Sequence, residues 1–151
     1  LGRVREVGGI TVENLWRQPF LSENEPVVMR GLVSHWAETQ MDDDALLSHL
    51  AEVSADRPMP FYTAPAEAGG RVFYNESMTG FNFERRTGRL RDCCVWLADN
   101  ASDPDAGMLY VGSTAVDGWL PGFSESHAVN LGVEEALCSL WLGTKARVAA
   151  H

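Results

Sequence analysis

The chain has 151 residues, 45% of them apolar, and a formal net charge of −9 at pH 7. This length can bury one hydrophobic core and is short for two, so we expect a single domain over residues 1–151. The excess of acidic groups disfavours broad nucleic-acid binding, which depends on clustered Lys and Arg that neutralise phosphates.

The two ends of the sequence and its cysteines predict a reduced, intracellular protein. The chain begins at Leu1 without an initiator Met and stops inside a strand-like pattern, so we expect it to be an excerpt of a longer domain. No signal-like segment opens it, and no apolar run reaches the roughly twenty residues of a membrane span. Its three cysteines include an adjacent pair and lack C-x-x-C spacing, which fits free thiols. We therefore expect a cytoplasmic protein outside the membrane.

Three segments have helical patterns. Thr11 can cap a short helix over residues 12–18, which Pro19 would close. A second helix is predicted over residues 42–53, and three aspartates open it, because a helix N-terminus favours negative charge. Cation binding by these aspartates is the less economical interpretation. A third helix is predicted over residues 90–98, with Cys93 and Cys94 on its core-facing side at i, i+3, i+4 and i+7 spacing.

Strands are predicted between and after these helices. The apolar run after Pro26 favours a strand buried on both faces. Residues 59–64 and 71–74 have strand-like aromatic content, and residues 108–111 (MLYV) form another candidate strand. Residues 112–136 predict a long loop anchored by Trp119 and Phe123, of the kind that often forms a lid or substrate wall.

Several polar residues outside these elements have two interpretations. Four arginines lie within seven positions, and they predict either a solvated turn and helix start or a patch for an acidic peptide, a phosphate or a cosubstrate carboxylate: Arg85, Arg86, Arg89 and Arg91. His35 could serve a site, but a His beside a Trp, here Trp36, is typical of a packing and hydrogen-bonding pair. His127 lies in the long loop, where it could approach a site.

The end of the chain reads as two short strands that meet at Gly143. Residues 137–142 form an apolar run, and residues 145–151 form a second extended run that ends on His151. A metal ligand that follows small residues has room in front of it for a cosubstrate. Geometry alone does not identify such a ligand.

Residues 140–151 (LWLGTKARVAAH) resemble the segment that leads into the His-x-Asp iron motif of cupin-like Jumonji-C oxygenases of the asparaginyl hydroxylase type. Residues 26–39 (PVVMRGLVSHWAET) are similar to the N-terminal signature of the same family, which has an apolar strand, then Arg-Gly, then His-Trp. The resemblance implies an α+β N-terminal portion with helices and strands that leads into a double-stranded β-helix, the cupin jelly roll, incomplete in this chain.

The same resemblance implies a chemistry. The family holds Fe(II) by two histidines and a carboxylate, with open positions for 2-oxoglutarate and oxygen, and hydroxylates a C–H bond as 2-oxoglutarate is decarboxylated. His151 would be the first iron ligand, and Tyr110 would contact the 2-oxoglutarate carboxylate. The alternative for Tyr110 is an ordinary tyrosine of the core or of the sheet surface. The other ligands and the basic residue that pairs with 2-oxoglutarate would lie beyond residue 151. The segment alone is therefore expected to bind iron weakly and to have no turnover.

Substrate and partners are less constrained. The resemblance implies hydroxylation of a protein side chain, with a protein or peptide as partner and a homodimer formed through C-terminal regions absent here. A tRNA base or a small molecule is an alternative substrate. Val148 stands where many relatives have Ser or Thr three residues before the first ligand, and this departure favours a second hypothesis, a metal-free cupin-fold binding module. A third interpretation is an α+β scaffold without a site.

Overall fold

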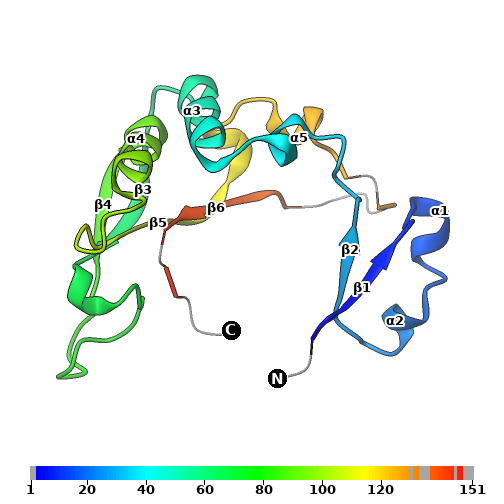
Figure 1. Ribbon diagram of the computed structural model, residues 1–151, viewed down its shortest axis with the longest axis horizontal. Helices are drawn as coiled ribbons and strands as arrows, with labels where there is room; N and C mark the ends of the chain where they lie inside the picture. The colour runs from blue at the N-terminus through cyan, green and yellow to red at the C-terminus, as the bar shows by residue number, and fades with distance from the viewer. Residues whose placement is uncertain (1–2, 130, 133–136, 145, 148–151) are drawn as a thin grey trace. The chain divides into compact units, whose positions relative to one another are not determined.

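The computed structural model describes residues 3–129, 131–132, 137–144 and 146–147, and it has a mixed α+β architecture (Figure 1). The chain forms two compact units. The first unit comprises residues 1–41 and 125–136, and the second comprises residues 42–124 and 137–151. That all 151 residues form one domain stays a prediction.

The first unit is built on two parallel strands, β1 (Arg5–Gly8) and β2 (Val27–Arg30). The chain between them forms two single-turn helices, α1 (Val12–Leu15) and α2 (Pro19–Ser22). The predicted helix over residues 12–18 is thus shorter than expected. Pro19 does not close it but begins α2 as its first residue, where its fixed φ suits a helix start and its missing N–H is not needed.

Strand β2 corrects the prediction of a strand buried on both faces. Its residues alternate between half-buried and exposed, and Val28 retains 37% exposure. A sheet of two strands, here β1 and β2, offers too little surface to cover both faces of either strand. Arg30 instead pairs with Glu6 across the two strands at 2.7 Å. A 3-10 helix, η1 (Ala37–Gln40), follows β2 after the His35–Trp36 pair.

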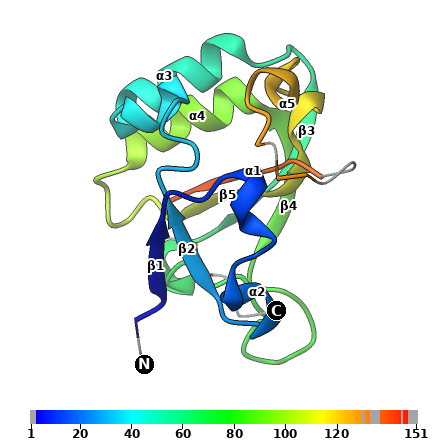
Figure 2. The same cartoon turned by 90° about the vertical axis from the view of Figure 1, so that its right-hand side faces the viewer.

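The second unit contains a four-stranded antiparallel sheet in the order β4-β3-β5-β6. Its strands are β3 (Pro58–Ala64), β4 (Glu84–Arg89), β5 (Met108–Ala115) and β6 (Ser139–Gly143). Two longer helices, α3 (Asp43–Val53) and α4 (Leu90–Asn100), pack side by side (Figures 1 and 2).

Both long helices form where the sequence predicts them. The side chain of Asp42 accepts a hydrogen bond from the backbone N–H of Ala45 at 2.8 Å, so it caps α3. The aspartate cluster therefore begins a helix, as expected. At the other end of the pair, the Asn100 amide donates to the Trp96 carbonyl at 2.8 Å and marks the last turn of α4.

The hydrophobic core of the second unit lies between these helices and one face of the sheet. It takes side chains from α3, α4, β3 and β5, including Leu50, Leu97, Met59 and Val111. Cys93 and Cys94 are buried within it, which confirms that they are core residues. Trp119 and Phe123 pack against this core, as predicted for anchors of the long loop.

A predicted strand is absent, and a predicted turn is a strand. Residues 71–74 do not form a strand and have only isolated bridges, such as that between Tyr74 and Phe81. The arginine-rich segment, expected as a turn and helix start, instead forms β4 and continues into α4 at Leu90. The segment is a strand because its backbone pairs with β3. Its side chains do not have the composition that favours strands, so the sequence did not predict one.

The long loop predicted over residues 112–136 contains regular structure. Strand β5 extends from Met108 to Ala115, four residues past the predicted end, and is followed by two short helices, η3 (Val116–Gly118) and α5 (Phe123–Ser126). A further 3-10 turn, η2 (Ala66–Ala68), follows β3. The predicted second strand at 145–151 lies mostly outside the described residues. Among the described residues, no helix has the length and apolar character needed to cross a membrane.

Candidate functional site

The sheet of the second unit has a face turned away from α3 and α4. Strand residues alternate between the two faces, and Phe61, Leu109 and Leu142 pack toward the helical core. Their neighbours Tyr62, Tyr110 and Trp141 therefore project to the opposite side. We call these three residues the tyrosine face.

The rings of the tyrosine face come from three adjacent strands and lie close together. Tyr62 is directly opposite Tyr110 in the β3–β5 register, and their ring centroids are 6.5 Å apart. The centroids of Tyr110 and Trp141 are 6.2 Å apart. Tyr110 is half-buried in the middle, whereas Trp141 is 51% exposed. The central ring is thus held from both sides while the surface stays accessible.

Two glycines make room for the ring of Tyr110. A Cβ at Gly112 would lie 2.7 Å from Cε1 of this ring. A Cβ at Gly143 would lie 3.2 Å from its Cδ2 and 2.8 Å from the carbonyl oxygen of Leu109. Gly143 lies opposite Tyr110 in the β5–β6 register. The predicted break at Gly143 is therefore also a close approach of backbone to ring, which only a residue without a side chain permits.

The hydroxyl of Tyr110 is neutral under ordinary conditions. Burial of the ring raises the pKa of Tyr110, and charge repulsion from Tyr62 raises it further. A phenol that stays protonated can donate a hydrogen bond to an anion. Tyr110 therefore fits the role of a donor to a carboxylate, which is the part of 2-oxoglutarate expected to meet it.

A row of aromatic rings continues from the tyrosine face along one edge of the unit. Phe83 contacts Tyr62 edge-on at 5.5 Å, and Phe81 stacks on Phe83 at 4.8 Å between centroids. Tyr74 stacks on Phe81 at 5.4 Å, and Phe73 follows at 5.4 Å. The aromatic residues of this segment were expected to lie in a strand. They lie instead in a segment of turns and isolated bridges over residues 73–83.

Asparagine side chains hold this turn. The Oδ1 of Asn75 accepts from the backbone N–H of Thr79 at 3.1 Å. The side chain of Asn82 accepts from the N–H of Phe73 at 2.9 Å and donates to the carbonyl of Arg71 at 2.9 Å. These side chains form hydrogen bonds with backbone N–H and C=O groups of the same segment. In a strand, such groups would pair with a neighbouring strand.

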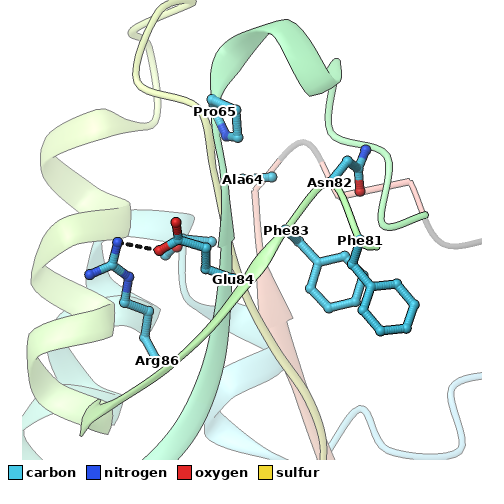
Figure 3. A pocket seen from close by; sticks show the side chains of 8 residues that line it. Ala64, Pro65, Phe81, Asn82, Phe83, Glu84 and Arg86 are labelled. Atoms are coloured by element: carbon cyan, nitrogen blue, oxygen red, sulfur yellow. Dashed lines mark hydrogen bonds and ion pairs between the residues drawn. The ribbon is translucent and has the colours of Figure 1, made fainter. Parts of the chain in front are cut away.

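A cavity of about 460 Å³ lies where β3 ends and β4 begins (Figure 3). The stacked rings of Phe81 and Phe83 form one part of its lining, and the ion pair between Glu84 and Arg86 forms another. The cavity combines an apolar wall with charged groups, which is typical of a site for a side chain or small molecule.

A second cavity of about 430 Å³ lies between α4 and the helix-facing side of the sheet, with Phe61, Cys93 and Trp96 in its lining. Burial raises the pKa of the Cys93 thiol to about 12, and the neighbouring Cys94 contributes. Burial likewise raises the pKa of Cys94 to about 11. Neither thiol is a nucleophile at neutral pH, because the thiolate is the reactive form.

The histidines of the first unit form a packed cluster. Nε2 of His127 lies 3.0 Å from Oε2 of Glu38, its Nδ1 lies 2.9 Å from Oγ of Ser126, and its ring meets Trp36 edge-on at 5.1 Å. His35 also contacts Trp36 edge-on at 6.3 Å. Trp36 therefore has ring contacts with both histidines, while His35 itself is exposed.

The metal prediction falls outside the part of the chain that the structure describes. His151 and Val148 both lie beyond the last described residue, Arg147. Within the described ranges, no group of three or more His, Cys, Asp or Glu side chains is arranged to hold a metal ion. On the cosubstrate side, Tyr110 offers a neutral hydroxyl that can donate to a carboxylate, and its contact with 2-oxoglutarate stays a prediction.

The sequence analysis chose Tyr110 as a candidate but did not predict the residues that surround it. Tyr62 and Trp141 had a detectable signal, because each alternates with core residues along its strand and so shares one face with Tyr110. Gly112 had no such signal, since its closeness to the ring depends on how the Tyr110 side chain turns.

Among curated proteins, a comparison found no match. The model of the cupin-like domain family matches residues 13–151, which covers all but the first twelve residues. This match shows that the chain belongs to the cupin-like domain family.

Proposed function

We propose that this protein is an Fe(II)- and 2-oxoglutarate-dependent oxygenase that hydroxylates a protein side chain, and that its sheet is the start of a double-stranded β-helix. The observation that carries this proposal is the placement of Tyr110. In a cupin-like domain, a neutral phenol stands on an accessible sheet face, between two glycines whose absent side chains leave space for its ring.

The proposed work of Tyr110 is to bind and orient the cosubstrate. Its hydroxyl would donate a hydrogen bond to a carboxylate oxygen of 2-oxoglutarate. A hydrogen bond to a charged group contributes about 1.5–3 kcal/mol. Tyr62 and Trp141 flank the ring, with centroids 6.5 Å and 6.2 Å from that of Tyr110.

The proposed work of His151 is to bind the metal. It lies eight residues after the end of β6 in the sequence, and β6 is the strand whose Gly143 lies opposite Tyr110. Bound iron would supply the activation of oxygen that hydroxylation requires. The net charge of −9 supports a protein substrate over RNA.

A metal-free cupin-fold binding module is the second candidate. Val148 favours it, because an apolar side chain replaces the hydroxyl that many relatives place near the cosubstrate. This candidate predicts an intact fold and an intact tyrosine face without metal-dependent binding of 2-oxoglutarate.

Titration of Mn(II) into the full-length protein with 2-oxoglutarate present tests the proposal. Mn(II) substitutes for Fe(II) without redox chemistry. We expect binding that is lost in His151→Ala and kept in His35→Ala, which removes an exposed histidine of the first unit. Binding that survives His151→Ala would exclude His151 as a ligand, and absence of binding in the unaltered protein would favour the metal-free module.

Substitution of Tyr110 tests the cosubstrate role. In Tyr110→Phe we expect the KM for 2-oxoglutarate to rise about tenfold or more, because a charge-assisted hydrogen bond is lost while the ring remains. Tyr74→Phe removes a hydroxyl from an exposed ring of the aromatic row and is the matched control. An equal effect of the two substitutions would refute a specific role for the Tyr110 hydroxyl.

A further inference from the structure

Strand β4 is an outer strand of the sheet in the second unit. The strand order β4-β3-β5-β6 leaves one side of β4 without a strand partner among the described residues (Figure 1). Residues 84–87 of this strand are exposed, and half-buried Gly88 follows them. An outer strand presents unpaired N–H and C=O groups that can accept a further strand.

Two prolines indicate which backbone groups of β4 point outward. Pro60 and Pro58 of β3 lie opposite Thr87 and Arg89, and neither proline has an N–H to donate. Pairs that exchange two hydrogen bonds alternate along an antiparallel ladder. The two-bond pairs are then those at positions 61 with 86 and 59 with 88, so the N–H groups of Arg85 and Thr87 point away from β3.

The side chains along this edge are basic although the whole chain is acidic. Four of the twelve Lys and Arg residues lie in the eight positions from 84 to 91. Arg86 pairs with Glu84, and Arg89 pairs with Asp56 at 2.9 Å. Arg85 is exposed and lies opposite Tyr62 in the register. An extended partner with acidic side chains would find complementary charge on both faces of the strand.

Besides its basic side chains, this edge has the cavity of about 460 Å³ at the start of β4. Its wall of Phe81 and Phe83 can take an apolar side chain, while Glu84 and Arg86, which also line it, point to the other side of β4 (Figure 3). Peptides that add a strand to a sheet edge gain affinity from backbone hydrogen bonds and specificity from pockets for alternate side chains.

We propose that the free edge of β4 binds an extended acidic peptide segment of a partner protein as an added strand, with one apolar side chain of the peptide in the cavity at Phe81 and Phe83. The backbone of Arg85 and Thr87 forms the new ladder, and the arginines hold the acidic side chains. This site stands independently of the oxygenase activity, because it uses neither Tyr110 nor His151.

The competing interpretation is protective. Charged residues on an outer strand prevent pairing between copies of a protein. That interpretation explains the arginines, but it gives no role to the aromatic cavity beside them. It also predicts that no peptide orders the outer amides of β4.

Fluorescence anisotropy of a labelled synthetic peptide with the full-length protein tests the proposal. The probe alternates glutamate and valine with one central phenylalanine and is about eight residues long, a common strand length. A peptide with lysine in place of every glutamate is its counterpart. We expect binding of the acidic probe only, weakened about tenfold or more in the double variant Arg85→Glu, Arg86→Glu.

The matched control is the double variant Arg3→Glu, Arg17→Glu, which changes the net charge equally but at two exposed positions of the first unit. It should leave binding nearly unchanged. Hydrogen exchange distinguishes strand addition from loose charge attraction, since the amides of Arg85 and Thr87 should become protected when the probe binds. Phe81→Ala should weaken binding through the cavity without changing the salt dependence.

Any of four outcomes would overturn the proposal. These are no binding of the acidic probe, binding without protection of the two amides, equal loss of binding in the control variant, and displacement of the probe by a single-stranded oligonucleotide. Displacement by the oligonucleotide would mean that the arginines bind the phosphates of a nucleic acid. Self-association of the Arg85→Glu, Arg86→Glu variant without peptide binding would support the protective interpretation instead.

Discussion

The contact between Gly112 and the ring of Tyr110 gives the sharpest test of the site geometry. In Gly112→Ala the new Cβ would lie 2.7 Å from Cε1, 3.0 Å from Cζ and 3.1 Å from the hydroxyl oxygen. All three atoms belong to a side chain, so the ring must turn from its position. An overpacked site costs about 1–3 kcal/mol, and the lower backbone entropy of alanine when unfolded offsets about 0.4–1 kcal/mol.

We therefore expect Gly112→Ala to lower the free energy of unfolding by about 1 kcal/mol, measured by denaturant titration of the full-length protein. In a Tyr110→Ala background the obstacle is gone, so the same substitution should become neutral or stabilising. Gly143→Ala behaves differently, because its Cβ would also lie 2.8 Å from the backbone oxygen of Leu109. Its cost should persist in the Tyr110→Ala background.

Gly8→Ala is the control for both glycines, since a Cβ there meets no atom within 4 Å. We expect a change within about 0.5 kcal/mol. If Gly112→Ala destabilises equally with and without the ring of Tyr110, then the glycine does not serve to seat that ring, and the reasoning about the site is refuted.

Three further predictions concern the second unit. Asp42→Ala should lower the free energy of unfolding by about 1 kcal/mol through loss of the α3 cap, whereas Asp42→Asn, which keeps a capping oxygen, should be nearly neutral; thermal unfolding compares the two. Iodoacetamide at pH 8 should modify exposed Cys138 and leave Cys93 and Cys94 unreacted. The pKa values of these two thiols, about 12 and 11, mean that the reactive thiolate forms only well above neutral pH. Mass spectrometry of the alkylated native protein measures the labelling, and early labelling of Cys93 would contradict the prediction. Leu97→Ala should cost about 2–5 kcal/mol because it opens a cavity at a side chain that is 1% exposed, and a loss below about 1 kcal/mol by denaturant titration would mean that this part of the core can collapse.

Helices α3 and α4 show what the sequence by itself determined. Their apolar spacing and the aspartates before α3 are local signals, because the 3.6-residue repeat and the N-cap depend only on nearby residues. The burial of Cys93 and Cys94 followed from the same spacing. The resemblance to the cupin family rested on two short stretches of sequence, and the match of residues 13–151 to the cupin-like domain confirms the family. The role of Tyr110 that the resemblance implies stays a prediction.

The strands show what only the tertiary structure decided. The segment that forms β4 has no apolar alternation, and it is a strand because β3 lies beside it along six residue pairs. Residues 71–74 have a strand-like composition, yet the local hydrogen bonds of Asn75 and Asn82 fold them into a turn. The tyrosine face depends on the register of β3, β5 and β6. Strand pairing joins residues far apart in sequence, so propensity cannot specify which strands meet or which rings share a face.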